Sequence, residues 1–89
     1  MGIMNKILLI EDDQSINKIL AYELSKKGYQ VDSLFDGKEA VQTILKKDYD
    51  LVLVDWMLPY QDGVSIIKEV RSNDYVKPLI LLTARSEQE

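Results

Sequence analysis

The 89-residue sequence has no cysteine, no cluster of basic residues and no long apolar run, and each absence excludes a class of protein. Without cysteine, neither a disulfide framework nor a thiolate metal site can form, which fits a reducing compartment. The 11 Lys and Arg residues are scattered among 15 Asp and Glu residues, so we expect no direct contact with nucleic acid by this segment. The longest apolar run, residues 76–84, is interrupted by Lys77 and is too short to span a membrane.

What is present is the composition of one small globular domain. Hydrophobic residues make up 46% of the chain, which is enough for a core and argues against disorder. No linker, internal repeat or low-complexity tract interrupts the sequence. We therefore predict a single cytoplasmic domain over residues 1–89, with no membrane contact.

Four strand candidates alternate with helical patterns along this domain. They lie at residues 6–10, 30–34, 50–54 and 78–83. Three patterns between them predict helices whose inward faces carry apolar residues at helical spacing: Ile16, Ile19, Leu20 and Leu24; Ala40, Ile44 and Leu45; Val64, Ile67 and Val70. This alternation predicts an α/β fold with a parallel sheet.

Residues typical of helix ends flank the three helical patterns. Gly28 stands where a glycine would end the first helix. Asp36 and Glu39 resemble a capping box, in which Asp36 is the N-cap of the second helix and Glu39 lies three residues later. Asp62 and Gly63 are typical of a turn, and the third helix is expected to begin there.

Acidic residues follow the first and third predicted strands where each ends. Glu11, Asp12 and Asp13 follow the first strand, and Asp55 closes the third. In open parallel sheets the ligand site lies beyond the carboxyl ends of the strands, so these carboxylates are expected to share one crevice. Like charges that lie so close favour a bound cation, and the sequence therefore predicts a metal site.

Some of these residues also have a purely structural explanation. Acidic residues such as Glu11, Asp12 and Asp13 also favour helix N-termini through capping and the helix dipole. Asp55 ends an apolar strand and does not precede a helix, so a functional role explains it better. Thr83 is either a β-branched strand end or a hydroxyl donor at the same edge. Trp56 and Met57 are most simply partly buried packing groups, although a loop carbonyl there could ligate a hard cation.

Four segments together resemble the receiver domain of bacterial two-component response regulators, and most closely the OmpR/PhoB-like branch. They read ILLIEDD, DLVLVDWMLP, DG and LLTA, at residues 7–13, 50–59, 62–63 and 81–84. The resemblance implies a flavodoxin-like (CheY-like) doubly wound parallel sheet, with strand order 2-1-3-4-5 in a complete domain. It also implies a phosphoacceptor switch in signal transduction rather than an enzyme.

The resemblance assigns roles to five residues. Asp55 would accept a phosphoryl group from a sensor histidine kinase, and Thr83 would be the switch hydroxyl. Glu11, Asp12, Asp55 and the main-chain carbonyl of Met57 would hold Mg²⁺. Transcription would be regulated through a C-terminal DNA-binding domain that is absent from these 89 residues.

The chain departs from the family pattern after Thr83. A complete receiver has a fifth strand, ending in a Lys that pairs with the phosphoryl group, and a fifth helix. Neither Lys77, at the opposite end of the fourth strand, nor Arg85 replaces that Lys well. We therefore expect strand order 2-1-3-4 and Mg²⁺ binding with weak phosphorylation. Because one side of the third and fourth strands would be uncovered, we also expect a homo-oligomer formed by edge pairing or element exchange.

Two alternative functions stay open. One is an interaction module that keeps the receiver fold without being phosphorylated. The other is a Mg²⁺-dependent phosphohydrolase similar to the haloacid dehalogenases, which also use an Asp nucleophile. That family places its nucleophile after the first strand in an Asp-x-Asp pattern, and residues 11–13 here are Glu-Asp-Asp, which disfavours this alternative.

Overall fold

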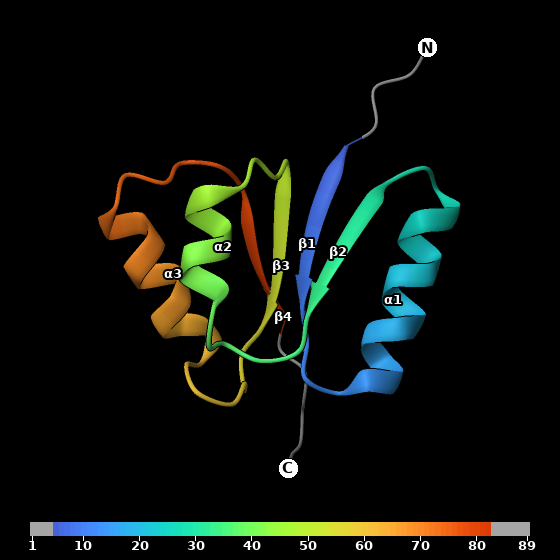
Figure 1. Cartoon of the computed structure of the whole chain (residues 1–89), viewed down its shortest axis with the longest axis horizontal. Helices are drawn as coiled ribbons and strands as arrows, with labels where there is room; N and C mark the ends of the chain where they lie inside the picture. Colours follow the sequence, from blue (N-terminus) through green and yellow to red (C-terminus); the bar gives the residue numbers. More distant parts are fainter. Residues whose placement is uncertain (1–4, 83–89) are drawn as a thin grey trace.

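The computed structural model describes residues 5–82, which fold into a four-stranded parallel sheet flanked by helices (Figure 1). The strand order is β2-β1-β3-β4, which confirms the predicted topology. Thr83 and Arg85 lie outside the described residues. The elements in chain order are β1 (Lys6–Ile10), α1 (Gln14–Lys26), β2 (Gln30–Leu34), α2 (Ala40–Lys46), β3 (Leu51–Asp55), α3 (Gly63–Ser72) and β4 (Leu79–Leu82).

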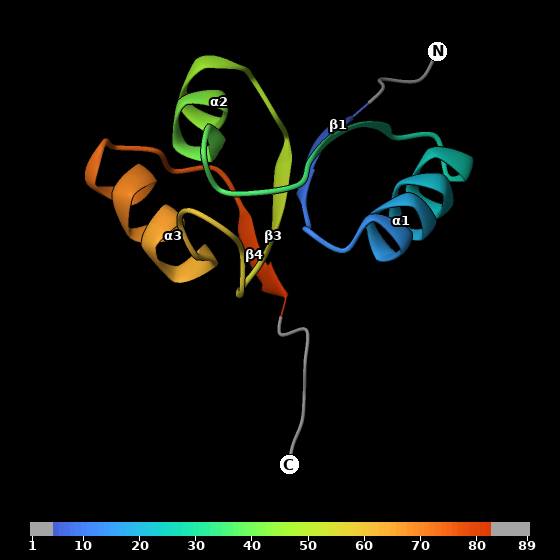
Figure 2. The same ribbon diagram turned by 60° about the horizontal axis from the view of Figure 1, so that its bottom comes forward.

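The helices divide between the two faces of the sheet. Helix α1 lies on one face, and α2 and α3 lie together on the other (Figures 1 and 2). Right-handed crossovers between parallel strands produce this arrangement when the chain reverses direction after β2. None of the helices within residues 5–82 is long and apolar enough to cross a membrane.

The core lies on the face covered by α2 and α3. Alternate residues of β1 and β3 point toward these helices because side chains along a strand alternate between its two faces. Each fully buried aliphatic side chain contributes roughly 1.5–3 kcal/mol to folding. The buried members of this core are Leu8, Ile10, Ala40, Ile44, Tyr49, Val52, Val54, Ile66 and Val70.

The face covered by α1 is buried unevenly. Ile7 and Leu9 of β1 are buried under α1, whereas Ile80 of β4 is 48% exposed. The expected inward face of α1 is wrong at Ile16 and Ile19, which are 42% and 61% exposed. The helix itself forms as predicted, but its covered face does not include these two side chains.

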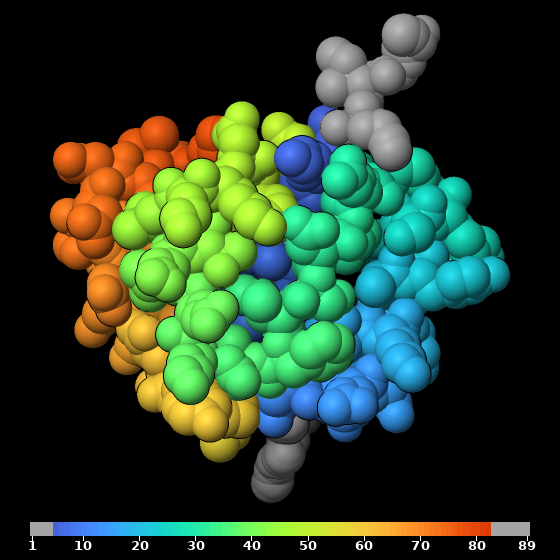
Figure 3. Space-filling model, viewed as in Figure 1, coloured from blue at the N-terminus to red at the C-terminus, as the bar shows by residue number. Residues whose placement is uncertain are grey.

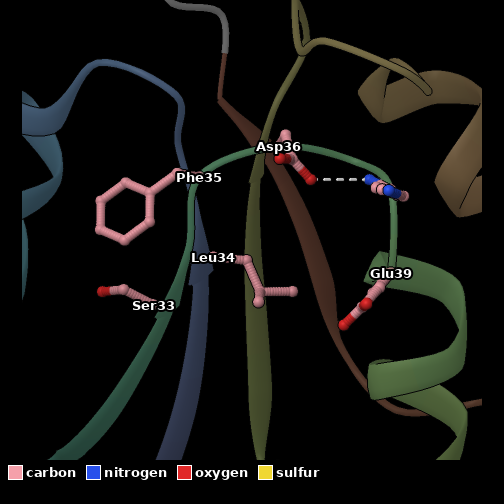
Figure 4. A pocket seen from close by; sticks show the side chains of 6 residues that line it. Ser33, Leu34, Phe35, Asp36 and Glu39 are labelled. Atoms are coloured by element: carbon pink, nitrogen blue, oxygen red, sulfur yellow. Dashed lines mark hydrogen bonds between the residues drawn. The ribbon is translucent and has the colours of Figure 1, made fainter.

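Helix α2 begins later in the chain than the sequence predicted. The predicted capping box is wrong, because α2 begins at Ala40 and the side chain of Glu39 makes no cap bond. Asp36 instead accepts a hydrogen bond from the Lys38 N–H at 2.9 Å, in the turn before the helix (Figure 4). A Cβ on Gly37 would lie 2.1 Å from the Gln61 carbonyl oxygen, so the β2–α2 loop is held against the β3–α3 loop before the helix can begin.

The other helix ends agree with the sequence. Asp62 caps α3 by accepting from the Ser65 N–H at 2.9 Å, and Asp13 caps α1 by accepting from the Ile16 N–H at 3.1 Å. Gly28 follows the last turn of α1 with φ +99°, a conformation that glycine adopts without steric cost. On α3 the buried positions are Gly63, Ile66 and Val70, whereas the predicted inward residues Val64 and Ile67 are only partly buried. On α2 the predicted inward residue Leu45 is 41% exposed.

A hollow lies between β2 and α2 on the face of the molecule that Figure 3 shows, and atoms of β1 form its bottom. It has a volume of about 550 Å³, and its lining includes Leu8, Asp32 and Tyr49. The Tyr49 hydroxyl donates to the Asp32 carboxylate at 2.6 Å across this hollow. Burial raises the pKa of Tyr49 above its usual value, and the bond to Asp32 raises it further.

Candidate metal centre

Three carboxylates meet at the carboxyl edge of the sheet. β1 and β3 are neighbours in register, with Ile10 beside Val54, so the residues that follow them lie side by side. Glu11, Asp12 and Asp55 each offer a carboxylate oxygen, and these three atoms lie within 4.8 Å of one another. The crevice that the sequence predicted at this edge is therefore present.

Burial makes this concentration of negative charge costly. Asp55 is fully buried and Glu11 is 2% exposed, whereas Asp12 is exposed. Burial raises the pKa of Glu11, and the charges of Asp55 and Asp12 raise it further, while a hydrogen bond from the Asp13 N–H opposes the rise. Removing a charge from water costs several kcal/mol per ion unless an opposite charge compensates it. A bound cation would supply that compensation.

Main-chain and side-chain hydrogen bonds hold the acidic loop in place. The Glu11 N–H donates to the Leu34 carbonyl at 3.1 Å, which ties the end of β1 to the end of β2. The Glu11 carboxylate accepts from the Asp13 N–H at 2.9 Å. Because Asp13 also caps α1, the helix position and the direction of the Glu11 carboxylate are linked.

The loop after β3 forms the opposite wall. A cavity of about 400 Å³ lies against Asp12, Trp56, Met57, Leu58, Pro59 and Asp62. Asp12 and Met57 therefore border the same space, as a shared cation would require. The side chains of Trp56 and Met57 are exposed, so their expected role as partly buried packing groups is wrong. The Trp56 N–H donates to the Leu82 carbonyl at 3.2 Å, while the Trp56 side chain is 48% exposed.

Close backbone packing fixes where this loop enters α3. The Gly63 N–H donates to the Trp56 carbonyl at 2.7 Å. A Cβ on Gly63 would lie 2.4 Å from the carbonyl oxygen of Asp55, so only glycine fits here without a backbone shift. Gly63 thus permits the N-terminus of α3 to pack directly behind Asp55.

The middle of the same loop is conformationally strained. The Gln61 N–H donates to the Pro59 carbonyl at 2.9 Å, and the residue between them, Tyr60, has φ 75°. These are the features of a classic γ-turn, which is rare for a non-glycine residue. The Lys38 Nζ lies 5.6 Å from the centre of the Tyr60 ring, and this cation–π contact links the β2–α2 loop to the turn.

One residue near the site, Asn17, was not predicted from the sequence. Asn17 is buried on α1, and its side chain donates to the main-chain carbonyl of Glu11 at 3.0 Å. A signal was available, because Asn17 interrupts the apolar positions that continue at Leu20 and Leu24, three and seven residues later. A polar residue on a buried helix face requires hydrogen-bond partners.

Comparisons with known proteins agree with this geometry. A model of the response regulator receiver domain matches residues 7–89. The chain is 44% identical over 82 residues to the transcriptional regulatory protein DltR of Streptococcus agalactiae, covering 92% of this chain and 37% of that protein. The chain thus spans less than two fifths of the length of this relative.

Solved receiver structures have the same fold. The receiver domain of the Francisella response regulator 1452 superposes with a TM-score of 0.87 at 35% identity, covering 93% of this chain and 69% of that one. The response regulator TrrA of Thermotoga maritima, solved in complex with Mg²⁺ and BeF, gives a TM-score of 0.86 at 35% identity, covering 93% and 72%.

Proposed function

Because this chain belongs to the response regulator receiver domain family, we propose that it is a phosphoacceptor module of a two-component system. Asp55 accepts the phosphoryl group, and a sensor histidine kinase donates it. The observation that carries the proposal is the buried Asp55 carboxylate at the end of β3, with oxygens of Glu11 and Asp12 within 4.8 Å. By analogy with the transcriptional regulatory protein DltR, phosphorylation of this module regulates transcription through a further domain.

The donor set suits Mg²⁺, which prefers oxygen ligands such as carboxylates and main-chain carbonyls. Glu11, Asp12 and Asp55 supply the carboxylates, and Met57, across the same cavity from Asp12, supplies the carbonyl. When bound, the ion offsets the repulsion between these carboxylates and the incoming phosphoryl oxygens. The complex of TrrA with Mg²⁺ and BeF supports this assignment.

The chemical step is an in-line displacement on phosphorus. A carboxylate oxygen of Asp55 attacks the phosphorus of a phosphohistidine, the P–N bond breaks, and the imidazole nitrogen keeps the bonding electron pair. The product is an acyl phosphate. Phosphoryl transfer asks the protein mainly for positioning and charge neutralisation. Here β3 positions Asp55, and the close contact of Gly63 with the Asp55 main chain holds the strand end. Thr83 then senses the product as the switch hydroxyl.

We further propose that the module is cytoplasmic and that the 89-residue chain self-associates. β4 pairs with β3 on one side only within residues 5–82, and Ile80 is exposed on the face that α1 leaves uncovered. A second copy that pairs along β4, or exchanges elements, would bury this surface at about 25 cal/mol per Å². Light scattering over a concentration series tests this, and a monomer mass at high concentration would contradict it.

The phosphoacceptor proposal is tested by labelling. The chain is incubated with Mg²⁺ and acetyl phosphate, and its intact mass is measured by mass spectrometry. We expect slow gain of one phosphoryl group by the parent and none by Asp55→Asn. Asp13→Asn is the matched control, because it removes one charge from the acidic loop next to the three clustered carboxylates while asparagine still caps α1.

The outcomes separate the candidate functions. Labelling of Asp55→Asn at the parent rate would show that Asp55 is not the acceptor. Mg²⁺ binding by a parent that never becomes labelled would favour a receiver-like interaction module. Steady release of phosphate from a monoester substrate, lost in Asp55→Asn, would favour the phosphohydrolase.

A further inference from the structure

A buried polar bridge connects the acidic loop to the end of β2. Asn17 of α1 is 1% exposed. Its amide nitrogen donates to the main-chain carbonyl of Glu11 at 3.0 Å and to that of Leu34 at 3.3 Å. Its amide oxygen accepts from the Ser33 hydroxyl at 2.6 Å. Ser33 and Leu34 point to opposite sides of β2 (Figure 4), so the bridge uses one side chain and one main-chain carbonyl from the same strand end.

The bridge fixes the orientation of one particular peptide group. The Glu11 carbonyl belongs to the peptide that joins Glu11 to Asp12, the two acidic residues of the loop. Asn17 holds this carbonyl, while the Glu11 N–H on the other side of the same residue donates to Leu34 at 3.1 Å. Both peptide planes that flank Glu11 are therefore anchored. Because side-chain direction follows the backbone, this anchoring sets where the Glu11 and Asp12 carboxylates can point.

Two main-chain carbonyls fix the orientation of the Asn17 amide, and Ser33 completes its hydrogen bonds. An asparagine amide has two N–H donors and one carbonyl oxygen, and here all three take part. The carbonyls of Glu11 and Leu34 can only accept, so the nitrogen must face them and the oxygen must face Ser33. The Ser33 hydroxyl, which can donate or accept, donates to that oxygen, so every polar group of the buried amide has a partner.

Core packing alone does not explain an asparagine at this position. Residue 17 lies on the helix face that continues at Leu20 and Leu24, where an apolar side chain would bury area at no polar cost. A buried amide is favourable only with a full set of partners, and Asn17 has them. We propose that Asn17 is a positioning residue for the metal ligands Glu11 and Asp12, with Ser33 completing its hydrogen bonds. This inference rests on the proposed Mg²⁺ site.

The test measures Mg²⁺ affinity through tryptophan fluorescence. Trp56 is the single tryptophan of the sequence, and it lines the same cavity as Asp12, so its emission reports the site without ambiguity. Loss of a residue that orients metal ligands typically lowers affinity 10–100-fold. We expect Asn17→Leu to raise the Mg²⁺ dissociation constant about tenfold or more. Ser33→Ala should raise it by a smaller factor.

Two controls separate positioning from general damage to the fold. Asn73→Leu makes the same chemical change at an exposed position past the end of α3, where the Asn73 amide donates to the Glu69 carbonyl at 2.9 Å, and it should leave Mg²⁺ affinity unchanged. Calcium provides the second control, because Mg²⁺ demands near-ideal octahedral geometry and Ca²⁺ tolerates irregular sites. Asn17→Leu should therefore weaken Mg²⁺ binding more than Ca²⁺ binding, whereas a merely structural role would weaken both equally.

Each outcome decides one proposition. If the parent does not bind Mg²⁺, the proposed metal site is wrong and this inference is wrong with it. If the parent binds and Asn17→Leu binds equally well, or loses Mg²⁺ and Ca²⁺ equally, only the positioning role is overturned. If Asn17→Leu does not fold by circular dichroism, Ser33→Ala decides, and an unchanged dissociation constant in that variant overturns the inference.

Discussion

Acidic residues have different surroundings at the two ends of the strands, the amino edge and the carboxyl edge of the sheet. At the amino edge, Asp48 pairs with Lys77, and Asp50 accepts from the Lys6 N–H at 2.8 Å. At the carboxyl edge, acidic side chains are instead gathered against one another, and two of the three are buried. An acidic residue that has a cation or an N–H donor beside it needs no further ligand. A buried group of carboxylates whose oxygens lie within 4.8 Å of one another calls for a ligand.

The largest expected effect that would sharpen this comparison is stabilisation by Mg²⁺. A ligand that binds only the folded state stabilises it by about 2.7 kcal/mol at 100 times its dissociation constant. We expect Mg²⁺ to raise the melting temperature of the parent and to have little effect on Asp12→Asn, which loses one of the three carboxylates. Differential scanning fluorimetry across a Mg²⁺ series measures this. An undiminished Mg²⁺ effect in Asp12→Asn would break the comparison, because the carboxyl edge would then not be the binding site.

The next effect concerns an acidic residue that already has a donor, Asp32. Tyr49→Phe removes the hydroxyl that donates to Asp32 at 2.6 Å. A hydrogen bond to a charged group contributes roughly 1.5–3 kcal/mol, so the free energy of unfolding should fall by about that amount. Urea denaturation at neutral pH measures the difference. An unchanged midpoint would show that the bond contributes nothing in solution.

The raised pKa of the Tyr49 hydroxyl also predicts that the free energy of unfolding falls at alkaline pH. Folding raises the pKa of its hydroxyl from the usual value of 10.0, so the folded state holds the proton more tightly than the unfolded state does. The corresponding stabilisation is complete below pH 10 and declines as the pH rises above it. Tyr49→Phe should therefore lose less stability between pH 9 and pH 11 than the parent. An identical decline in both chains would contradict the assignment.

A smaller effect is expected at the strained turn of the carboxyl edge. Tyr60 has φ 75°, a conformation that costs an L-residue about 1–2 kcal/mol and glycine almost nothing. Tyr60→Ala and Tyr60→Gly both lose the ring contact with Lys38. Glycine should nevertheless be more stable than alanine by about 1 kcal/mol, because only glycine relieves the backbone. Chemical denaturation of the pair checks this, and equal stability would show that the turn is unstrained in solution.

The smallest effect is expected at the amino edge. Asp48→Asn breaks the exposed ion pair with Lys77, and exposed pairs contribute little because water and salt screen them. Stability should change less than in any variant above, and Mg²⁺ affinity should not change. A Mg²⁺ titration of this variant beside Asp12→Asn makes the comparison direct. Equal losses of affinity in the two would show that net charge, not the carboxyl-edge site, determines binding.

The sequence predicted the strands and the acidic crevice well, and for the same physical reason. Apolar runs are typical of strands that are buried on both faces, and β1 has the predicted bounds, while β3 is shifted by one residue to Leu51–Asp55. β2 also has the predicted bounds, although its sequence, QVDSL, is not an apolar run and is only partly buried. Parallel strands place their carboxyl ends at one edge, so residues that follow β1 and β3 had to meet. The family followed from the spacing of the same segments.

The sequence by itself therefore determined the fold class and the carboxylates of the candidate metal centre, because these depend on local periodicity and on the geometry of a parallel sheet. The strand order came from the resemblance to the receiver family, and the structure confirms it. Tertiary structure alone decided where α2 begins, which face of α1 is covered, and what Asn17 contacts. The contacts responsible join residues far apart in the chain, such as Gly37 with Gln61 and Asn17 with Ser33. No local pattern records such pairs, because they form only when separate elements pack together.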